Sequence, residues 1–213
     1  MRLVCISDTH GDHESVSLPA GDVLIHAGDV TGHGTENETR SFFQWMSKQS
    51  FKHKICIAGN HDTFMEDDPV TTAQLAIDSG VSLLNASGVE INGVHFWGSP
   101  ITPRFMHWSF MLDEGAPIEE HWNQIPLNTD VLITHGPPFG VLDVVIREDM
   151  PDEAVGCRAL LQRISVVKPR LHLFGHIHEG FGSRQVNDVL HRNISTMNRH
   201  YQIVNDPQVI DLT

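Results

Sequence analysis

The stretch Ile55-Cys56-Ile57-Ala58-Gly59-Asn60-His61-Asp62 is an apolar run that stops at a glycine and is followed at once by an amide, an imidazole and a carboxylate. This pattern is typical of a buried β-strand that delivers polar side chains to the edge of a sheet. Gly-Asn also occurs in ordinary turns, so the stretch alone is modest evidence. It gains weight because four other apolar runs in the chain end in the same way.

The five apolar runs predict five strands, and each strand is followed by candidate metal-ligating or acid–base side chains. The predicted strands are residues 2–7, 22–26, 54–58, 130–134 and 171–174. The side chains that follow them are, in order, Asp8 and His10, Asp29, Asn60 and His61, His135, and His176 and His178. The carboxyl ends of strands in an α/β protein line the ligand crevice, so strands in one sheet would bring these side chains together. Such convergent sites are few in any protein, which makes coincidence a poor explanation.

Other patterns fill in the secondary structure around these strands. Thr35 and Glu38 form a capping-box pattern before a predicted helix over Arg40–Gln49. Helices are also predicted over 69–79, between Pro69 and Gly80, and over about 156–167. Asn92-Gly93 separates two short alternating runs and predicts an antiparallel hairpin. The tail, from about 184 to 213, is predicted to form short strands and turns.

Residues 99–128 are irregular and rich in Pro, Trp and His. A loop this long in a compact domain is usually functional or a lid. Taken together, the elements predict a single α/β domain over residues 1–213.

The composition restricts the class of protein. Fourteen basic and 27 acidic residues give a formal charge of −13, which argues against a long nucleic acid as a partner. No apolar run approaches the roughly 20 residues of a membrane-spanning helix, and the N-terminus lacks the apolar region of a signal peptide. We therefore expect a cytoplasmic protein without a membrane partner. Nothing in the sequence distinguishes a monomer from an oligomer.

The histidines and cysteines point to metal chemistry without thiolates. Three cysteines are far apart, and Cys5 and Cys56 lie in apolar strand patterns, where a free thiol packs as a small hydrophobe. Histidine, aspartate and asparagine ligands suit Zn, Mn or Fe with open coordination positions rather than a closed structural zinc site. The ligands are too many for one ion, but they suit two if one carboxylate bridges. Two such ions clamp a phosphorus centre and attract an anionic substrate to an otherwise acidic protein.

The motifs resemble those of a known family. Asp8-x-His10, Gly28-Asp29, Gly59-Asn60-His61-Asp62, His135 and Gly175-His176-x-His178 match, in order, the five signatures of the calcineurin-like metallophosphoesterases. Further features, including His135-Gly-Pro-Pro-Phe-Gly and Ile177-His178-Glu179-Gly180-Phe181-Gly182, make the chain most similar to the metallophosphoesterase-domain-containing (MPPED) group of phosphodiesterases. Some animal members of that group look weakened by a glycine at the first histidine of the last motif, whereas this chain keeps His176. The chain departs from the group at Arg104, where a tryptophan is expected.

The resemblance implies a four-layer αββα sandwich of two mixed sheets and a role for each motif residue. Two divalent ions are implied, Mn²⁺ being favoured over Fe or Zn. Asp8, His10 and His178 would hold the first ion, Asn60, His135 and His176 the second, and Asp29 would bridge them. A hydroxide between the ions would attack phosphorus in line with the leaving group. His61 would stabilise the transition state or protonate the leaving oxygen, and Asp62 would orient His61.

Several alternatives stay open at this point. Arg104 could clamp a phosphate oxygen and Trp108 could stack on a base, with His107 between them, or this loop could merely be pinned by its prolines and one aromatic ring. We expect His26 and His172 to be packed residues, and His13, His33, His53, His121, His191 and His200 to lie on the surface. The three tryptophans Trp45, Trp97 and Trp122 are expected in the core.

The predicted function is a dinuclear metal-dependent phosphodiesterase acting on a small phosphodiester, with cyclic nucleotides among the candidates. A phosphomonoesterase is the nearest alternative. A nucleotide-binding regulator with little turnover and a structural metalloprotein are the alternatives from other classes.

Overall fold

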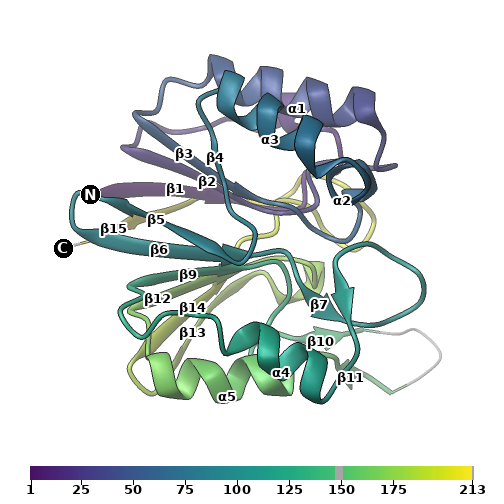
Figure 1. Cartoon of the computed structure of the whole chain (residues 1–213), viewed down its shortest axis with the longest axis vertical. Coiled ribbons are helices and arrows are strands. Elements are labelled where there is room, and N and C mark those ends of the chain that lie inside the picture. Colours follow the sequence, from purple (N-terminus) through teal and green to yellow (C-terminus); the bar gives the residue numbers. More distant parts are fainter. Residues whose placement is uncertain (147–150, 213) are drawn as a thin grey trace.

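The computed structural model describes residues 1–146 and 151–212, and it contains two mixed β-sheets that face each other (Figure 1). The first sheet has the strand order β15-β1-β2-β3-β4. Its members are β15 (Gln208–Asp211), β1 (Arg2–Ile6), β2 (Val23–Ala27), β3 (His53–Ile57) and β4 (Ser82–Leu83). Strands β1 to β4 are mutually parallel, and β15 joins β1 in the antiparallel sense.

The second sheet has the strand order β13-β14-β12-β9-β6-β5. Its members are β13 (Gly182–Val186), β14 (Val189–Asn193), β12 (Leu171–Phe174), β9 (Val131–Thr134), β6 (Val94–Ser99) and β5 (Ser87–Ile91). The four central strands are parallel, and an antiparallel strand closes each edge. Asn92 and Gly93 turn between β5 and β6 with φ of 52° and 80°, so the predicted hairpin is confirmed.

The helices cover the outer faces of the two sheets, which gives four layers (Figure 1). Helices α1 (Glu36–Lys48) and α3 (Pro69–Asp78) cover the first sheet, and α4 (Ala116–Trp122) and α5 (Arg158–Val167) cover the second. The shorter elements are η1 (His13–Ser15), α2 (Thr63–Asp67), η2 (His178–Gly180) and the strand pairs β7 (Thr102–Pro103) with β8 (Met111–Leu112) and β10 (Val144–Val145) with β11 (Glu153–Ala154). The predicted αββα sandwich is therefore confirmed.

Alternation along β1 explains why the strand sequences are apolar throughout. Leu3 and Cys5 enter the core between the sheets, whereas Val4 and Ile6 enter the core beneath α1. Successive side chains of a strand point to opposite faces, so a strand covered on both sides needs a continuous apolar run. A third cluster, which includes Trp97 and Trp122, fills the space between the second sheet and helices α4 and α5.

Local signals fix the ends of the helices. The Thr35 side chain accepts a hydrogen bond from the Glu38 N–H, and the Glu38 carboxylate accepts one from the Thr35 N–H, so the predicted capping box is present at the start of α1. Pro69 opens α3, and Asp68 caps it by accepting from the Thr71 N–H. No helix within residues 1–146 and 151–212 is long and apolar enough to cross a membrane.

Two sequence expectations need correction, and one set is confirmed. The five motif-bearing strands divide between the two sheets, with β1, β2 and β3 in the first and β9 and β12 in the second. His13 and His191 are buried, not on the surface. His13 packs against Phe42 and Trp45 of α1, and His191 lies with Nδ1 at 3.1 Å from that of His172. As expected, Trp45, Trp97, Trp122, Cys5, Cys56, His26 and His172 are buried.

Candidate metal centre

The polar residues of the five motifs meet at the end of the sandwich opposite the chain termini (Figure 1). Strands β1, β2 and β3 of the first sheet are followed by Asp8, His10, Asp29, Asn60 and His61, and strands β9 and β12 of the second by His135, His176 and His178. Parallel strands of each sheet end at the same edge, and the two edges face each other. The site is thus built at the seam between the sheets, from the carboxyl ends of strands in both.

One group of potential ligands consists of Asp8, His10 and His178, whose ligand atoms lie within 4.8 Å of one another. The Nε2 atoms of His10 and His178 are 3.3 Å apart, and His178 Nε2 is 3.6 Å from Asp8 Oδ1. Burial would raise the pKa of Asp8, but the hydrogen bond and charge of His178, with further charge from His135 and His10, hold this pKa well below its usual range. Asp8 is therefore a buried carboxylate in its ionised form.

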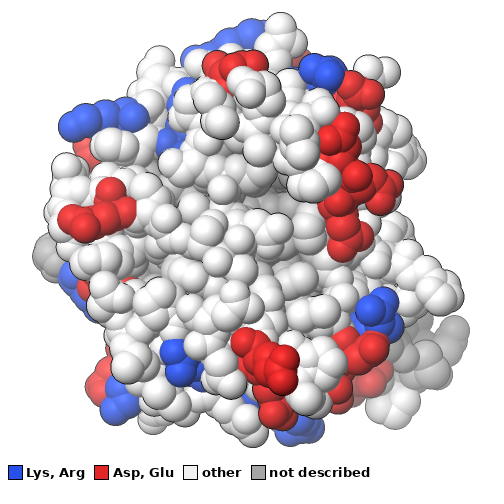
Figure 2. Space-filling model, in the orientation of Figure 1, with Lys and Arg blue, Asp and Glu red and all other residues white. Residues whose placement is uncertain are grey.

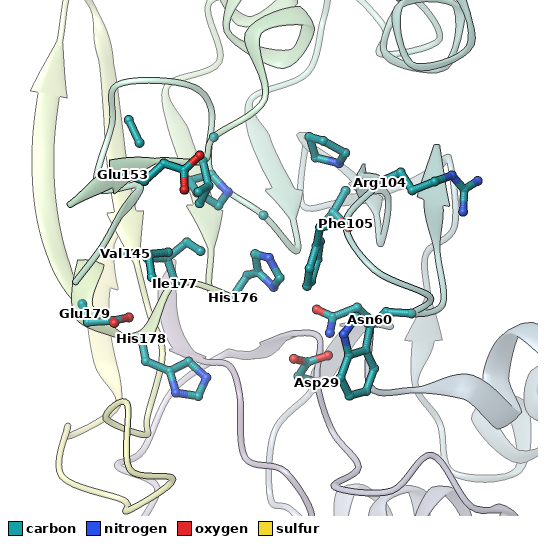
Figure 3. A pocket seen from close by; sticks show the side chains of 18 of the residues that line it. Asp29, Asn60, Arg104, Phe105, Val145, Glu153, His176, Ile177, His178 and Glu179 are labelled. Atoms are coloured by element: carbon teal, nitrogen blue, oxygen red, sulfur yellow. The ribbon is translucent and has the colours of Figure 1, made fainter. Parts of the chain in front are cut away.

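A second group consists of Asp29, His135 and His176, again with ligand atoms within 4.8 Å of one another. His135 Nε2 lies 2.9 Å from Asn60 Oδ1 and 3.3 Å from Asp29 Oδ2, so Asn60 belongs to the same group. Burial lowers the pKa of His135, but the Asp29 carboxylate beside it outweighs this effect and raises the pKa to about 9. Figure 3 shows Asp29, Asn60 and His176 close together on one side of the pocket.

Asp29 of the second group also reaches His10 of the first, and these two residues form a further group of potential ligands with His61. Its Oδ2 is 3.8 Å from His10 Nε2 on one side and 3.3 Å from His135 Nε2 on the other. Burial raises the pKa of Asp29, but the charge of His135 and its hydrogen bond outweigh burial and lower the pKa far below the usual range. An ionised carboxylate at this position is able to serve both groups.

The outer hydrogen bonds of the histidines fit divalent metal ions. His135 Nδ1 donates to the Ala27 carbonyl at 3.0 Å, and His178 Nδ1 donates to the Asn198 carbonyl at 2.9 Å. A carbonyl oxygen only accepts, so both Nδ1 atoms carry a proton. Both Nε2 atoms face the carboxylates, as N–H donors without metal and as lone-pair ligands once an ion displaces that proton. Imidazole lone pairs and ionised carboxylates that face one another repel unless protons or cations lie between them, which is the donor set that Zn²⁺, Mn²⁺ and iron bind.

The backbone is strained at four of the ligand positions. Asp8, His10, Asp29 and His176 have φ values of 54°, 42°, 54° and 67°. This left-handed conformation costs a non-glycine residue on the order of 1 kcal/mol, and such strain is concentrated at functional sites. The carboxylate of Asp8 is held in place by Ser195 Oγ at 2.7 Å and by the His176 N–H at 3.0 Å.

The glycines of the motifs are required by close approach between strand ends. A Cβ atom at Gly28 would lie 2.5 Å from the Ala58 carbonyl and 2.7 Å from His135 Nδ1. A Cβ at Gly59 would overlap the Asp29 carboxylate, and one at Gly175 would overlap the Asp8 carboxylate and Ser7 Oγ. The glycines therefore make room for side chains that follow other strands, either in the same sheet or in the facing one.

His61 lies beside both groups with its ring orientation fixed. Its backbone N–H donates to Asp29 Oδ1 at 2.8 Å, and its Nδ1 donates to the Gly32 carbonyl at 3.2 Å, which leaves Nε2 free to exchange a proton in the cavity. The His61 ring is edge-on to His10, with centroids 4.6 Å apart, and it stacks on Trp108, with centroids 4.4 Å apart and planes at 30°.

Asp62 acts on His61 through the backbone and not through the imidazole. Its buried carboxylate accepts hydrogen bonds from the N–H groups of Gly59, Val30 and Thr31 at 2.7, 3.2 and 2.9 Å. The Thr31 hydroxyl bridges the Asp62 carboxylate and the His61 carbonyl at 2.8 and 2.9 Å. Asp62 thus makes the expected contact not with the His61 ring but with the backbone, through hydrogen bonds that join the loops after β2 and β3.

The three substrate candidates in the 99–128 segment separate in the structure. Trp108 lines the cavity and stacks on His61. Arg104 also lines it, but its guanidinium pairs with Asp113 and points away from the ligands in Figure 3, so the phosphate clamp is not supported. His107 is exposed and is not among the described residues that line the cavity.

The segment after β14 contributes residues that the motif search missed. Ser195 binds Asp8, Asn198 fixes the ring of His178, and Tyr201 packs its ring 4.9 Å from that of His10. A signal for them exists, because β14 is followed by Ser195 and Thr196, which is again a strand ending in polar residues. Thr31, which follows Asp29 on the loop after β2, carried no comparable signal.

The ligand groups open into a cavity of about 690 Å³. Side chains from the 99–128 segment, from β11 and the start of α5, and from the loop around Tyr201 line its walls. Phe105 lies against His176, with ring centroids 5.3 Å apart (Figure 3). Among the residues that the structure describes, the charged side chains on its walls are Glu114, Glu153, Glu179, Arg104, Arg158 and Arg199.

Comparison with known proteins gives a consistent result. A family model described as calcineurin-like phosphoesterase matches residues 1–180. Metallophosphoesterase domain-containing protein 1 of Homo sapiens and its Mus musculus counterpart are each 39% identical over 234 residues, which covers 99% of this chain and 71% of the relative.

Two solved structures share the fold. Phosphopantetheinyl hydrolase from Mycobacterium tuberculosis superposes with a TM-score of 0.66 at 16% identity, covering 94% of this chain and 90% of the other. The protein TT1561 of Thermus thermophilus superposes with a TM-score of 0.63 at 11% identity, covering 90% and 88%. At these identities the likeness concerns the architecture alone.

Proposed function

Because the chain belongs to the calcineurin-like phosphoesterases, a family of metal-binding hydrolases of phosphoric esters, we propose that it is a dinuclear phosphodiesterase acting on a small phosphodiester. The observation that carries the proposal is the pair of ligand groups with Asp29 between them and His61 beside them, open to one cavity. A structural metal site has no need of a free imidazole or of a substrate-sized cavity.

The two groups divide the ligands between two ions. Asp8, His10 and His178 would hold one ion, Asn60, His135 and His176 the other, and Asp29 would contact both. Divalent cations held there would activate water at neutral pH and neutralise charge on the phosphate oxygens. Asn60 is a neutral ligand, so the site keeps more positive charge than a third carboxylate would allow.

His61 protonates the leaving oxygen in this proposal. Its Nδ1 proton is committed to the Gly32 carbonyl, so Nε2 is the atom that delivers a proton into the cavity. Trp108 covers one face of the ring, which restricts its motion and its contact with water. The leaving group of a bound ester would therefore lie next to His61 and Trp108.

The balance of charge on the cavity wall favours a diester over a monoester. The described part of the wall has as many acidic as basic side chains, and Arg104 is paired with Asp113. A wall without an excess of positive charge offers no added attraction for the second charge of a monoester dianion, and the monoanion of a diester needs none. On the face shown in Figure 2, carboxylates gather near α2 while Lys and Arg are scattered, which also favours a small substrate over a polyanion.

The proposal is tested with the Mn²⁺-loaded protein on p-nitrophenyl phosphate and bis(p-nitrophenyl) phosphate. We expect the diester to be preferred and the His61→Ala variant to lose about 10²- to 10⁴-fold in kcat/KM. The exposed His107→Ala variant is the matched control and should keep wild-type activity. Protein that hydrolyses neither ester above the His61→Ala background would overturn the proposal, and preference for the monoester would make it a phosphomonoesterase.

Two further measurements separate the parts of the proposal. A general acid matters more for a poor leaving group, so His61→Ala should impair diphenyl phosphate more than bis(p-nitrophenyl) phosphate. Equal impairment would assign His61 to charge stabilisation instead. Metal analysis at saturation should give two ions per chain, and a value of one would refute the dinuclear site.

A further inference from the structure

The loop around Tyr201 lies outside residues 1–180, the part of the chain that matches the family model, yet it forms part of the site. Met197 and Ile203 pair in an antiparallel bridge, and the Asn198 N–H donates to the Gln202 carbonyl at 2.9 Å. The Asn198 carbonyl accepts from His178 Nδ1, which ties this small hairpin to a ligand. The hairpin is therefore held at a defined position over the first ligand group.

The hairpin places the Tyr201 ring against the ligands. Tyr201 has φ of 56°, and its N–H donates to the Asn198 carbonyl at 2.9 Å. Its ring centroid is 4.9 Å from that of His10, 5.4 Å from that of His178 and 6.4 Å from that of His61. The residue nevertheless stays 56% exposed, so much of its ring surface is available to a ligand in the cavity.

Tyr201 and Trp108 occupy different positions relative to His61. Trp108 stacks on His61 at 4.4 Å and is 40% exposed, whereas Tyr201 lies nearer His10 and His178. A diester has two ester groups on one phosphorus, and the one that leaves must lie beside the proton donor. The group that stays on phosphorus is then directed elsewhere, and the exposed ring on the His10 side is Tyr201.

We propose that Tyr201 packs against the retained ester group and selects phosphodiesters whose retained group carries a flat aromatic ring, such as an aryl group or a nucleobase. This inference rests on the proposed phosphodiesterase function and adds the part of the substrate that the family motifs do not address. Aromatic rings prefer offset-stacked or edge-to-face contacts, and a half-exposed tyrosine offers both arrangements at low entropic cost.

The test uses two diesters with the same leaving group, phenyl p-nitrophenyl phosphate and methyl p-nitrophenyl phosphate. The metal-loaded wild-type protein should favour the phenyl diester, and Tyr201→Ala should lower kcat/KM for it by about 2- to 12-fold while leaving the methyl diester unchanged. Tyr201→Phe keeps the ring and should keep the preference. Val204→Ala, an exposed substitution just beyond the hairpin, is the matched control and should behave as wild type.

A binding measurement gives a readout that does not depend on turnover. Phenyl phosphate and methyl phosphate are the products that carry the retained group, and their affinities follow from calorimetry on the metal-loaded protein. Tyr201→Ala should weaken phenyl phosphate by a similar factor, leave methyl phosphate unchanged and leave the metal content at the wild-type value. A loss of metal, or equal losses for both ligands, would overturn the inference and make Tyr201 a structural residue.

The outcomes separate this inference from the proposed function. Wild-type protein that cleaves neither diester overturns the phosphodiesterase, and the binding comparison then still decides the role of Tyr201. Wild-type protein that cleaves both diesters equally, with no change in Tyr201→Ala, overturns the inference alone.

Discussion

Removal of the Asp62 carboxylate should destabilise the protein more than the loss of any single surface contact. The side chain is fully buried and accepts hydrogen bonds from three backbone N–H groups, those of Gly59, Val30 and Thr31, and from the Thr31 hydroxyl. In Asp62→Ala the three N–H groups lose their acceptor in the protein interior. The substitution therefore tests whether this carboxylate holds the loops after β2 and β3 together.

The magnitude follows from the number of donors left without a partner. A buried donor without an acceptor costs about 1–3 kcal/mol, so three would cost about 3–9 kcal/mol. Burial and the negative charge of Asp29 raise the pKa of Asp62 to about 6, so removal of Asp62 relieves a repulsion. Water can also enter the space that the side chain leaves. These two effects reduce the expected cost to about 3–6 kcal/mol. Each carboxylate oxygen of Asp62 accepts from two donors. Asp62→Asn keeps one oxygen but places an amide N–H group against the two donors of the other, so we expect the free energy of unfolding to fall by about 2–4 kcal/mol.

Urea unfolding of the metal-free protein, followed by circular dichroism at pH 7, measures these losses. The control is Asp68→Ala, since Asp68 accepts from the Thr71 N–H and hydroxyl at the exposed start of α3 and should matter less than either Asp62 variant. With metal restored, Asp62→Ala should also lose about 100-fold in kcat/KM, as expected for a displacement of His61 by about 1 Å. An Asp62→Ala protein within about 1 kcal/mol of wild type, or one no less stable than Asp68→Ala, would refute the reasoning.

Three other substitutions test different parts of the site and core. Glycine tolerates the left-handed backbone at His176, where φ is 67°, so the free energy of unfolding of His176→Gly should lie within about 1 kcal/mol of the wild-type value. The variant should nevertheless bind one ion fewer and lose turnover, as metal analysis and the diester assay would show. In Gly175→Ala the new Cβ atom would overlap the Asp8 carboxylate and displace it, which should lower kcat/KM by at least about 100-fold. Full activity would show that the position of Asp8 does not require a glycine here. Burial and the nearby charge of Arg184 lower the pKa of His191 to about 4, so this histidine is neutral in the folded protein and takes up a proton on unfolding below a pH of about 6.5. The metal-free protein should therefore lose stability as the pH falls from about 6.5 to 4. In thermal melts, His191→Gln should make this pH dependence less steep.

The strands and the polar residues that cluster at their ends could be predicted because their signals are local. A strand covered on both faces must be apolar along its length, so its end is marked wherever the sequence turns polar, as at Asp8, Asp29 and Asn60. The Asn92-Gly93 hairpin is equally local, since only these residues accept the backbone that a two-residue turn requires. Such features need no knowledge of the rest of the fold.

Pairing between distant elements could not be predicted from the same signals. An apolar run indicates burial but not the neighbouring strand, so the strand ends alone do not show that β9 and β12 form the centre of the second sheet. The sequence around His13 predicts a surface residue because nothing nearby reveals that α1 covers it. The hydrogen-bond partners of Asp62 likewise depend on where the loop after β2 lies, and the position of Asp62 next to His61 in the sequence does not reveal this.

The division of the potential ligands between the two sheets would also give bound ions a mechanical role. Each ligand group takes side chains from both sheets, Asp8 and His10 with His178 in one and Asp29 and Asn60 with His135 and His176 in the other. Any ion bound there fastens the halves of the sandwich together, and its binding free energy becomes cohesion across the seam. Separation of the two halves would then release the metal and abolish activity at the same time. The stability of the protein against unfolding would therefore depend on the concentration of free metal ions.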